Sequence, residues 1–168
     1  MRIEAPKIET RSEKYIVQPM SQSVREILTS VKSLLGGTAG FTLGNSLLGV
    51  ILPLRMEAAG YPILLTGAIM AAYYLGLALG GLRGKHVIFR IGHIRAFAAF
   101  AALTAATILA YEAFFHPTAW MILRIVNGFC IAGMTAAIES WLNTRSSNQT
   151  RGRVLGFYML TFYLAIAA

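Results

Sequence analysis

The chain has 168 residues, of which 56% are hydrophobic and 13% are charged, and its formal net charge is +8. About 25% of the residues of a soluble domain are usually charged, so this composition argues against an ordinary soluble domain. The basic residues lie at the ends of long apolar runs instead of forming one basic, aromatic-interleaved surface, which excludes nucleic-acid binding as the main role. The composition predicts an all-α integral membrane protein.

Residues 1–33 precede the first apolar run and are predicted to be a cytoplasmic tail. Its first twenty residues alternate charges with few large apolar side chains, which is typical of disorder. In 21–35, apolar residues recur at helical spacing: Val24, Ile27, Leu28, Val31 and Leu35. This pattern predicts a short helix on the membrane surface, with an early extension of the first spanning helix as the alternative.

Apolar segments make up the rest of the chain, and most are long enough to cross a hydrocarbon core of about 30 Å. They predict spanning helices at 34–54, 61–82, 93–112, 118–142 and 152–168. The uncharged part of the last segment, 154–168, makes only about 22 Å of helix at about 1.5 Å per residue. It is followed by no exit loop or flanking charge, so we expect the chain to be a fragment of a longer protein.

The distribution of positive charge predicts the orientation of these spans. Of the fifteen Lys and Arg residues, all but Arg55 and Arg124 lie in the N-terminal tail, in 83–95 or in 143–153. Short loops rich in Lys and Arg stay on the cytoplasmic side of a membrane. We therefore expect a multi-pass protein of the inner (plasma) membrane with its N-terminus and both basic loops in the cytoplasm.

Two series of glycines, spaced four residues apart, mark expected helix-packing faces. The first series is Gly36, Gly40 and Gly44, and the second is Gly76, Gly80 and Gly84. Small residues at this spacing let helix backbones approach closely in lipid. Both series are therefore predicted to lie in close helix–helix contacts and not to bind a phosphate.

Four polar residues inside the predicted spans are candidates for a substrate or proton pathway: Asn45, Arg124, Asn127 and Glu139. The last three follow one helical stripe, which also carries Thr135. An arginine at the centre of a span costs about 2.5–3.5 kcal/mol on insertion scales, so such residues normally face a bundle interior or a water-filled cavity.

Each of these polar residues also has a structural interpretation. Arg124 would take part in a buried ion pair or hydrogen-bonded network, and Asn45 in a hydrogen bond between helices. Glu139 would form a salt bridge with a nearby cytoplasmic arginine, namely Arg145, Arg151 or Arg153.

The sequence contains no group of residues suited to catalysis or metal binding. His86, His93 and His116 are scattered and lack Cys or carboxylate partners at ligand spacing. No serine is placed with a base and an orienting group, and no carboxylate pair suggests hydrolysis. We therefore expect neither an enzyme nor a bound cofactor or metal.

Four short motifs occur in a characteristic order. The first span ends in Gly49-Val-Ile-Leu-Pro-Leu54, and the second reads Gly67-Ala-Ile-Met-Ala-Ala-Tyr-Tyr-Leu-Gly-Leu-Ala-Leu-Gly80. The next loop contains Arg90-Ile-Gly-His-Ile-Arg95, and the fourth span contains Arg124-Ile-Val-Asn-Gly128. Over residues 34–168 the chain resembles the N-terminal part of a major facilitator superfamily transporter.

This resemblance implies about five of the twelve helices of such a transporter, which moves a small solute by alternating access around a midplane site. It implies that the chain lies in the lipid bilayer and handles a small-molecule substrate, with or without proton coupling. It also implies that missing C-terminal helices or a partner complete the bundle. Arg90, Gly92 and Arg95 would belong to its gating loop. Phe89 stands where the family has an Asp, so the usual charge lock is not expected. The alternative function is a small multi-span membrane scaffold or accessory subunit.

Overall fold

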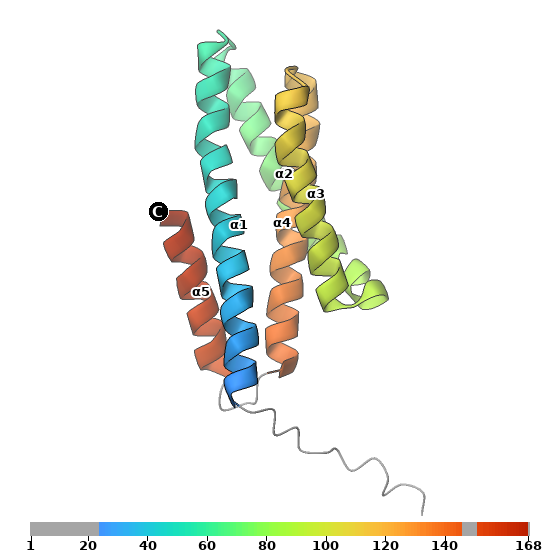
Figure 1. Ribbon diagram of the computed structural model, residues 1–168. Helices are drawn as coiled ribbons and strands as arrows, with labels where there is room; N and C mark the ends of the chain where they lie inside the picture. Colours follow the sequence, from blue (N-terminus) through green and yellow to red (C-terminus); the bar gives the residue numbers. More distant parts are fainter. Residues whose placement is uncertain (1–23, 146–150, 168) are drawn as a thin grey trace, which may run out of the picture. The chain divides into compact units, whose positions relative to one another are not determined.

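The computed structural model describes residues 24–145 and 151–167, which form five α-helices (Figure 1). They are α1 (Val24–Ala58), α2 (Ile63–Ile91), α3 (His93–Ala113), α4 (Pro117–Arg145) and α5 (Arg151–Ala167). Four described stretches are long and apolar enough to cross a membrane: Gly36–Ala58, Ile63–Ile91, His93–Ala113 and Pro117–Thr144. The apolar part of α5, Leu155–Ala167, is shorter. The described chain is thus an all-α, multi-pass membrane protein.

The N-terminal region is described only in part. The predicted tail over 1–20 lies outside the described residues, whereas residues 24–34 form the first turns of α1. Val24 to Leu35 contains no proline, so the helix continues into the apolar segment, and its position at the membrane surface stays a prediction. The packing described below concerns residues 35–167.

The predicted loop over 83–95 is helical for most of its length. α2 continues to Ile91, and Gly92 is the one non-helical residue before α3 begins at His93. No proline interrupts 83–91, and its charged side chains, such as Arg83 and Arg90, are exposed. The helix therefore extends beyond the apolar core with its charges in solvent.

α2 and α3 both pack along α4, and glycines set the distance between α2 and α4. A Cβ atom added at Gly76 would overlap the carbonyl oxygen of Ile125, and one at Gly128 would overlap the carbonyl oxygen of Tyr73. Only glycine permits such close backbone contact. We call this contact the α2–α4 seam, and its glycines are Gly76, Gly80, Gly84 and Gly128. The packing role predicted for the second glycine series is confirmed.

The first glycine series, in contrast, does not lie in a close helix–helix contact. A Cβ atom added at Gly36, Gly40 or Gly44 would meet no described atom within 4 Å. The prediction of close packing for this series is therefore wrong for the described residues. The spacing permits close approach but does not supply a partner helix, and α1 instead buries other positions, such as Thr42 and Leu52.

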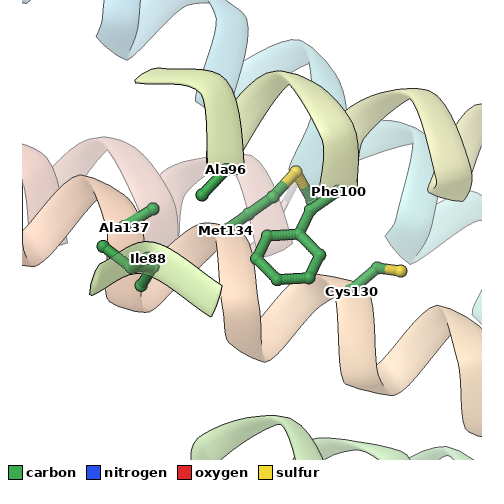
Figure 2. Close-up of a cluster of buried hydrophobic side chains, with 6 residues drawn as sticks. All are labelled: Ile88, Ala96, Phe100, Cys130, Met134 and Ala137. Atoms are coloured by element: carbon green, nitrogen blue, oxygen red, sulfur yellow. The ribbon is translucent and has the colours of Figure 1, made fainter. Parts of the chain in front are cut away.

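Buried apolar side chains form two clusters, one toward each end of the seam. Figure 2 shows the first, where the Phe100 ring of α3 lies beside Met134 of α4. A Cβ atom at Gly133 would lie 2.5 Å from this ring, so the glycine makes room for the phenylalanine. The cluster consists of Ile88, Ala96, Phe100, Cys130, Met134 and Ala137. Cys130 is a packing residue, as expected from its apolar surroundings.

The second cluster joins the other ends of the helices. It consists of Leu52, Met56, Ile69, Tyr111 and Trp120. Trp120 is 1% exposed, and its indole Nε1 donates a hydrogen bond to the carbonyl oxygen of Tyr111 at 3.3 Å. Close by in the chain, Arg55 at the end of α1 forms a salt bridge with Glu112 on α3. We call this the Pro117 end of the bundle and the opposite one the Gly92 end.

Candidate functional site

Several threonine side chains inside the described helices form hydrogen bonds within their own helix. The hydroxyl of Thr104 donates to the carbonyl oxygen of Phe100 at 2.9 Å, and that of Thr135 donates to the carbonyl oxygen of Ile131 at 2.9 Å. Such local bonds are the usual way to place a hydroxyl in lipid. Polar side chains that form no hydrogen bond within their own helix are therefore the positions to consider for function.

Arg124 is the most unusual of them. It is 2% exposed, its Nη2 donates to the sulfur of Met70 at 3.0 Å, and its Cζ lies 5.6 Å from the centroid of the Tyr73 ring. Within the part of the chain that the structure describes, its Nε has no hydrogen-bond partner and no carboxylate pairs with it. The predicted ion pair is absent there, and the charge is instead held by a thioether and an aromatic face.

Asn127 lies one helical turn from Arg124 and is completely buried. Among the described residues, neither Oδ1 nor Nδ2 of this amide has a hydrogen-bond partner. A buried polar group without a partner costs about 1–3 kcal/mol. Arg124 and Asn127 therefore place unsatisfied hydrogen-bonding capacity on one side of α4.

Tyr73 connects this region with α1. The Nδ2 atom of Asn45 donates a long hydrogen bond of 3.5 Å to the Tyr73 hydroxyl, while the same ring lies beside Arg124. The Oδ1 atom of Asn45 is buried without a partner in the described structure. The interhelical hydrogen bond considered for Asn45 is thus present, but it satisfies only half of the amide.

A cavity of about 90 Å³ is lined by residues of all five described helices, with Phe97 contributed by α3. Its hydrogen-bonding side chains are Thr38, Thr42, Asn45, Ser46, Tyr73, Thr135 and Tyr158. We call it the inter-helix cavity. Asn45 and Thr135 line it, whereas Arg124 and Asn127 do not. The polar residues predicted to form one stripe on α4 therefore do not all face the same cavity.

Glu139 lies in a third location, a groove of about 690 Å³ at the Gly92 end. The groove receives residues from α2, α3, α4 and α5: Lys85, Ile88, Phe89, His93, Ala136, Glu139, Ser140, Asn143, Leu155 and Met159. The Nε2 atom of His93 is 2.9 Å from the Ser140 hydroxyl, so α3 and α4 are linked there. Glu139 is thus in a wide, partly polar groove rather than in the inter-helix cavity.

The salt bridge considered for Glu139 is not seen among the side chains that the structure describes, where Arg55 and Glu112 form the ion pair. The side chains of Arg145 and Arg153 lie outside the described residues. The Nε atom of Arg151 is buried without a partner in the described structure.

The residues of the predicted gating loop surround a sharp break in the backbone. Gly92 has φ 86° and ψ 160°, and its N–H donates to the carbonyl oxygen of Ile88 at 2.8 Å, which ends α2. Its own carbonyl oxygen accepts from Ala96 N–H at 3.0 Å, which starts α3. Arg90 and Arg95 are exposed on either side. Gly92 thus reverses the chain within one residue.

Gly92→Ala is expected to lower the free energy of unfolding by about 1–3 kcal/mol, because this backbone region is essentially restricted to glycine. Gly81→Ala is the matched control, since Gly81 lies in α2 with no described atom within 4 Å of its Cβ position. Thermal unfolding of both variants in detergent, followed by tryptophan fluorescence, measures the difference. Equal melting temperatures would show that the turn relaxes to accommodate a side chain.

The sequence gives no sign that Met70 or Tyr111 contributes to the site, and an aromatic residue such as Tyr73 in an apolar span is more often a packing residue than a binding residue. Tyr111 is 3% exposed, and its hydroxyl has no partner in the described structure. Tyr73 instead touches both Asn45 and Arg124, whereas its neighbour Tyr74 is 69% exposed. Apolar and aromatic residues in an apolar helix give no signal of such a role, although Met70 and Tyr73 both lie within the motif Gly67–Gly80.

The sequence pattern of the Major Facilitator Superfamily matches residues 34–168. The chain is 29% identical over 134 residues to the uncharacterized MFS-type transporter YcaD of Salmonella arizonae, and 28% identical over 134 residues to YcaD of Salmonella newport. Each comparison covers 80% of this chain but 35% of the relative, so the chain spans about a third of the length of these curated relatives. No solved structure matches it. The family match covers most of the chain and confirms the resemblance seen in the motifs: the chain belongs to the Major Facilitator Superfamily.

Proposed function

We propose that this chain forms the first five helices of a secondary transporter that moves a small solute across the plasma membrane by alternating access. The N-terminus and the Gly92 end face the cytoplasm, as the positive charge at 83–95 favours. Asn45, Arg124, Asn127 and Glu139 lie on the substrate or proton pathway. The remaining helices of the transporter, or a partner, complete the bundle.

The observation that carries this proposal is the buried guanidinium of Arg124, which has no carboxylate partner in the described structure. A charge inside a membrane helix is costly, and such residues mark substrate, ion or proton pathways. A structural role would be served by a partner that neutralises the charge. Met70 and Tyr73 do not do so, which leaves Arg124 able to interact with a transported group.

The gating role belongs to the segment around Gly92. Arg90 and Arg95 are exposed beside the break between α2 and α3, where a moving half of the transporter can contact them. Phe89 is 89% exposed at the position of the family's Asp. The gate is therefore proposed to close through the arginines and apolar contact, without the usual Asp.

Proteoliposomes that contain the full-length gene product provide the test. Uptake is measured with a panel of radiolabelled sugars, sugar phosphates, amino acids and amphipathic drugs, and proton movement with an internal pH-sensitive dye. Uptake of at least one solute above the level of empty liposomes is expected. Stable insertion without any uptake, together with copurification of a stoichiometric partner, would favour a membrane scaffold or accessory subunit instead.

Glu139→Gln is expected to flatten the dependence of uptake on pH, because glutamine cannot carry the coupling proton. The Glu139 carboxylate forms no salt bridge among the described side chains, so it is free to exchange a proton with the groove. Glu112→Gln is the matched control, since that carboxylate is exposed and paired with Arg55. Uptake rates over a range of pH measure the effect, and an unchanged profile in Glu139→Gln would assign the carboxylate a structural role.

A further inference from the structure

The inter-helix cavity is lined by residues that are all uncharged at neutral pH. We propose that it is the part of the substrate site that selects an uncharged solute, one that carries an O–H or N–H donor next to an apolar face. This inference rests on the proposed transport function, and it names the class of substrate that the cavity accepts.

The described lining of this cavity offers no charge that would offset the lost hydration of an ion. The residues that line it, all described, include no Asp, Glu, Lys, Arg or His. Two charged residues of α4 lie elsewhere, since Arg124 contacts Met70 and Glu139 lines the groove. An ion that enters an apolar helix bundle loses its hydration and needs an opposite charge to offset this loss. Neutral hydroxyl and amide groups do not supply that charge.

The polar side chains of the lining define what the occupant must offer. The Oδ1 atom of Asn45 is itself fully buried, so an occupant of the cavity does not reach it. The lining offers hydroxyl groups, which both donate and accept hydrogen bonds. The hydroxyls of Thr42 and Ser46 lie on the same helix and line the same cavity. The polar wall is thus suited to hydroxyl or amide groups.

The rest of the cavity wall consists of apolar and aromatic side chains. They are Phe41, Phe97, Ile131, Met134, Ile138, Phe162 and Ile166. Binding sites of this kind combine apolar walls with a few polar groups that fix orientation. The volume of about 90 Å³ holds on the order of three waters, or a group with a similar number of heavy atoms. The selected group is therefore small and has both a polar and an apolar side.

Cysteine labelling of the full-length transporter in detergent tests this selectivity without knowledge of the natural solute. Thr135→Cys on α4 and Ser46→Cys on α1 place a thiol in the cavity, in a protein whose native cysteines, Cys130 included, are replaced by alanine. Asn143→Cys is the control, because it is exposed near the Gly92 end of α4. The probes are methyl methanethiosulfonate, which is uncharged, and its anionic sulfonatoethyl and cationic trimethylammonium-ethyl analogues.

Each rate at a cavity position is divided by the rate of the same reagent at Asn143→Cys. The uncharged reagent is expected to react at both cavity positions, and both charged reagents are expected to be slower by about 100-fold, given the cost of a charge in a helix bundle. Equal normalised rates for all three reagents would overturn the proposal. So would the failure of every reagent to reach both cavity thiols while Asn143→Cys reacts.

This test and the transport test fail independently. If uptake is found but charged reagents enter the cavity freely, the class of substrate is wrong and the transport function stands. If the cavity excludes charge but no solute is taken up, the cavity keeps its selectivity and the transport function fails.

Discussion

Arg124→Ala is expected to abolish solute uptake by the full-length transporter while making the folded protein more stable. The guanidinium is buried without a carboxylate partner in the described structure, so its removal leaves no opposite charge unpaired. An arginine at a helix centre costs about 2.5–3.5 kcal/mol, of which a cation–π contact returns about 0.5–2 kcal/mol. A net gain in stability on the order of 1 kcal/mol is expected.

Proteoliposome uptake and thermal unfolding of the same preparation measure the two effects together. Arg55→Ala is the matched control, because it removes a guanidinium that is partly exposed and paired with Glu112 at the Pro117 end. It should keep its uptake. If Arg124→Ala transports normally, or if it loses uptake only because it unfolds, Arg124 has a structural role.

Gly76→Val is expected to separate α2 from α4 and to destabilise the protein by more than the usual 1–3 kcal/mol of an overpacked core. At this position even a Cβ atom overlaps the backbone of Ile125, and backbone cannot move aside as a flexible side chain can. Because the seam also holds Tyr73 next to Arg124, uptake should be lost as well.

Gly81→Val provides the comparison on the same helix, since its Cβ position meets no described atom within 4 Å. Both variants change the helix propensity equally, so the difference between their melting temperatures in detergent reports the seam alone. Similar melting temperatures for Gly76→Val and Gly81→Val would mean that α2 and α4 do not approach as closely as the structure indicates.

The two glycine series show what sequence periodicity can and cannot predict. Both have the same spacing, yet Gly76 contacts α4 while Gly40 faces open space among the described residues. Spacing determines which residues share a face of a helix. It does not determine which face receives a neighbour, because that depends on helices elsewhere in the chain or on a partner.

The candidate site was predicted only in part for a similar reason. Arg124 and Glu139 share a helical stripe, but fifteen residues of helix separate them by about 22 Å. One stripe of that length passes through the seam, the inter-helix cavity and the groove. The sequence identified the polar residues themselves because charge and amide groups stand out in apolar helices. It gave no sign that a thioether, Met70, would be the contact of the buried guanidinium.

The unequal packing of the helices has a mechanical consequence. α2 and α4 are in close backbone contact at the seam, so we expect them to move together. α1 has no such contact, because its glycines face open space among the described residues, and α5 contacts α4 only sparsely. The inter-helix cavity therefore has one stiff wall and two compliant ones, which carry Asn45 and Tyr158. It can widen or narrow through tilting of α1 and α5 while the apolar cluster around Phe100 keeps its contacts between α2, α3 and α4.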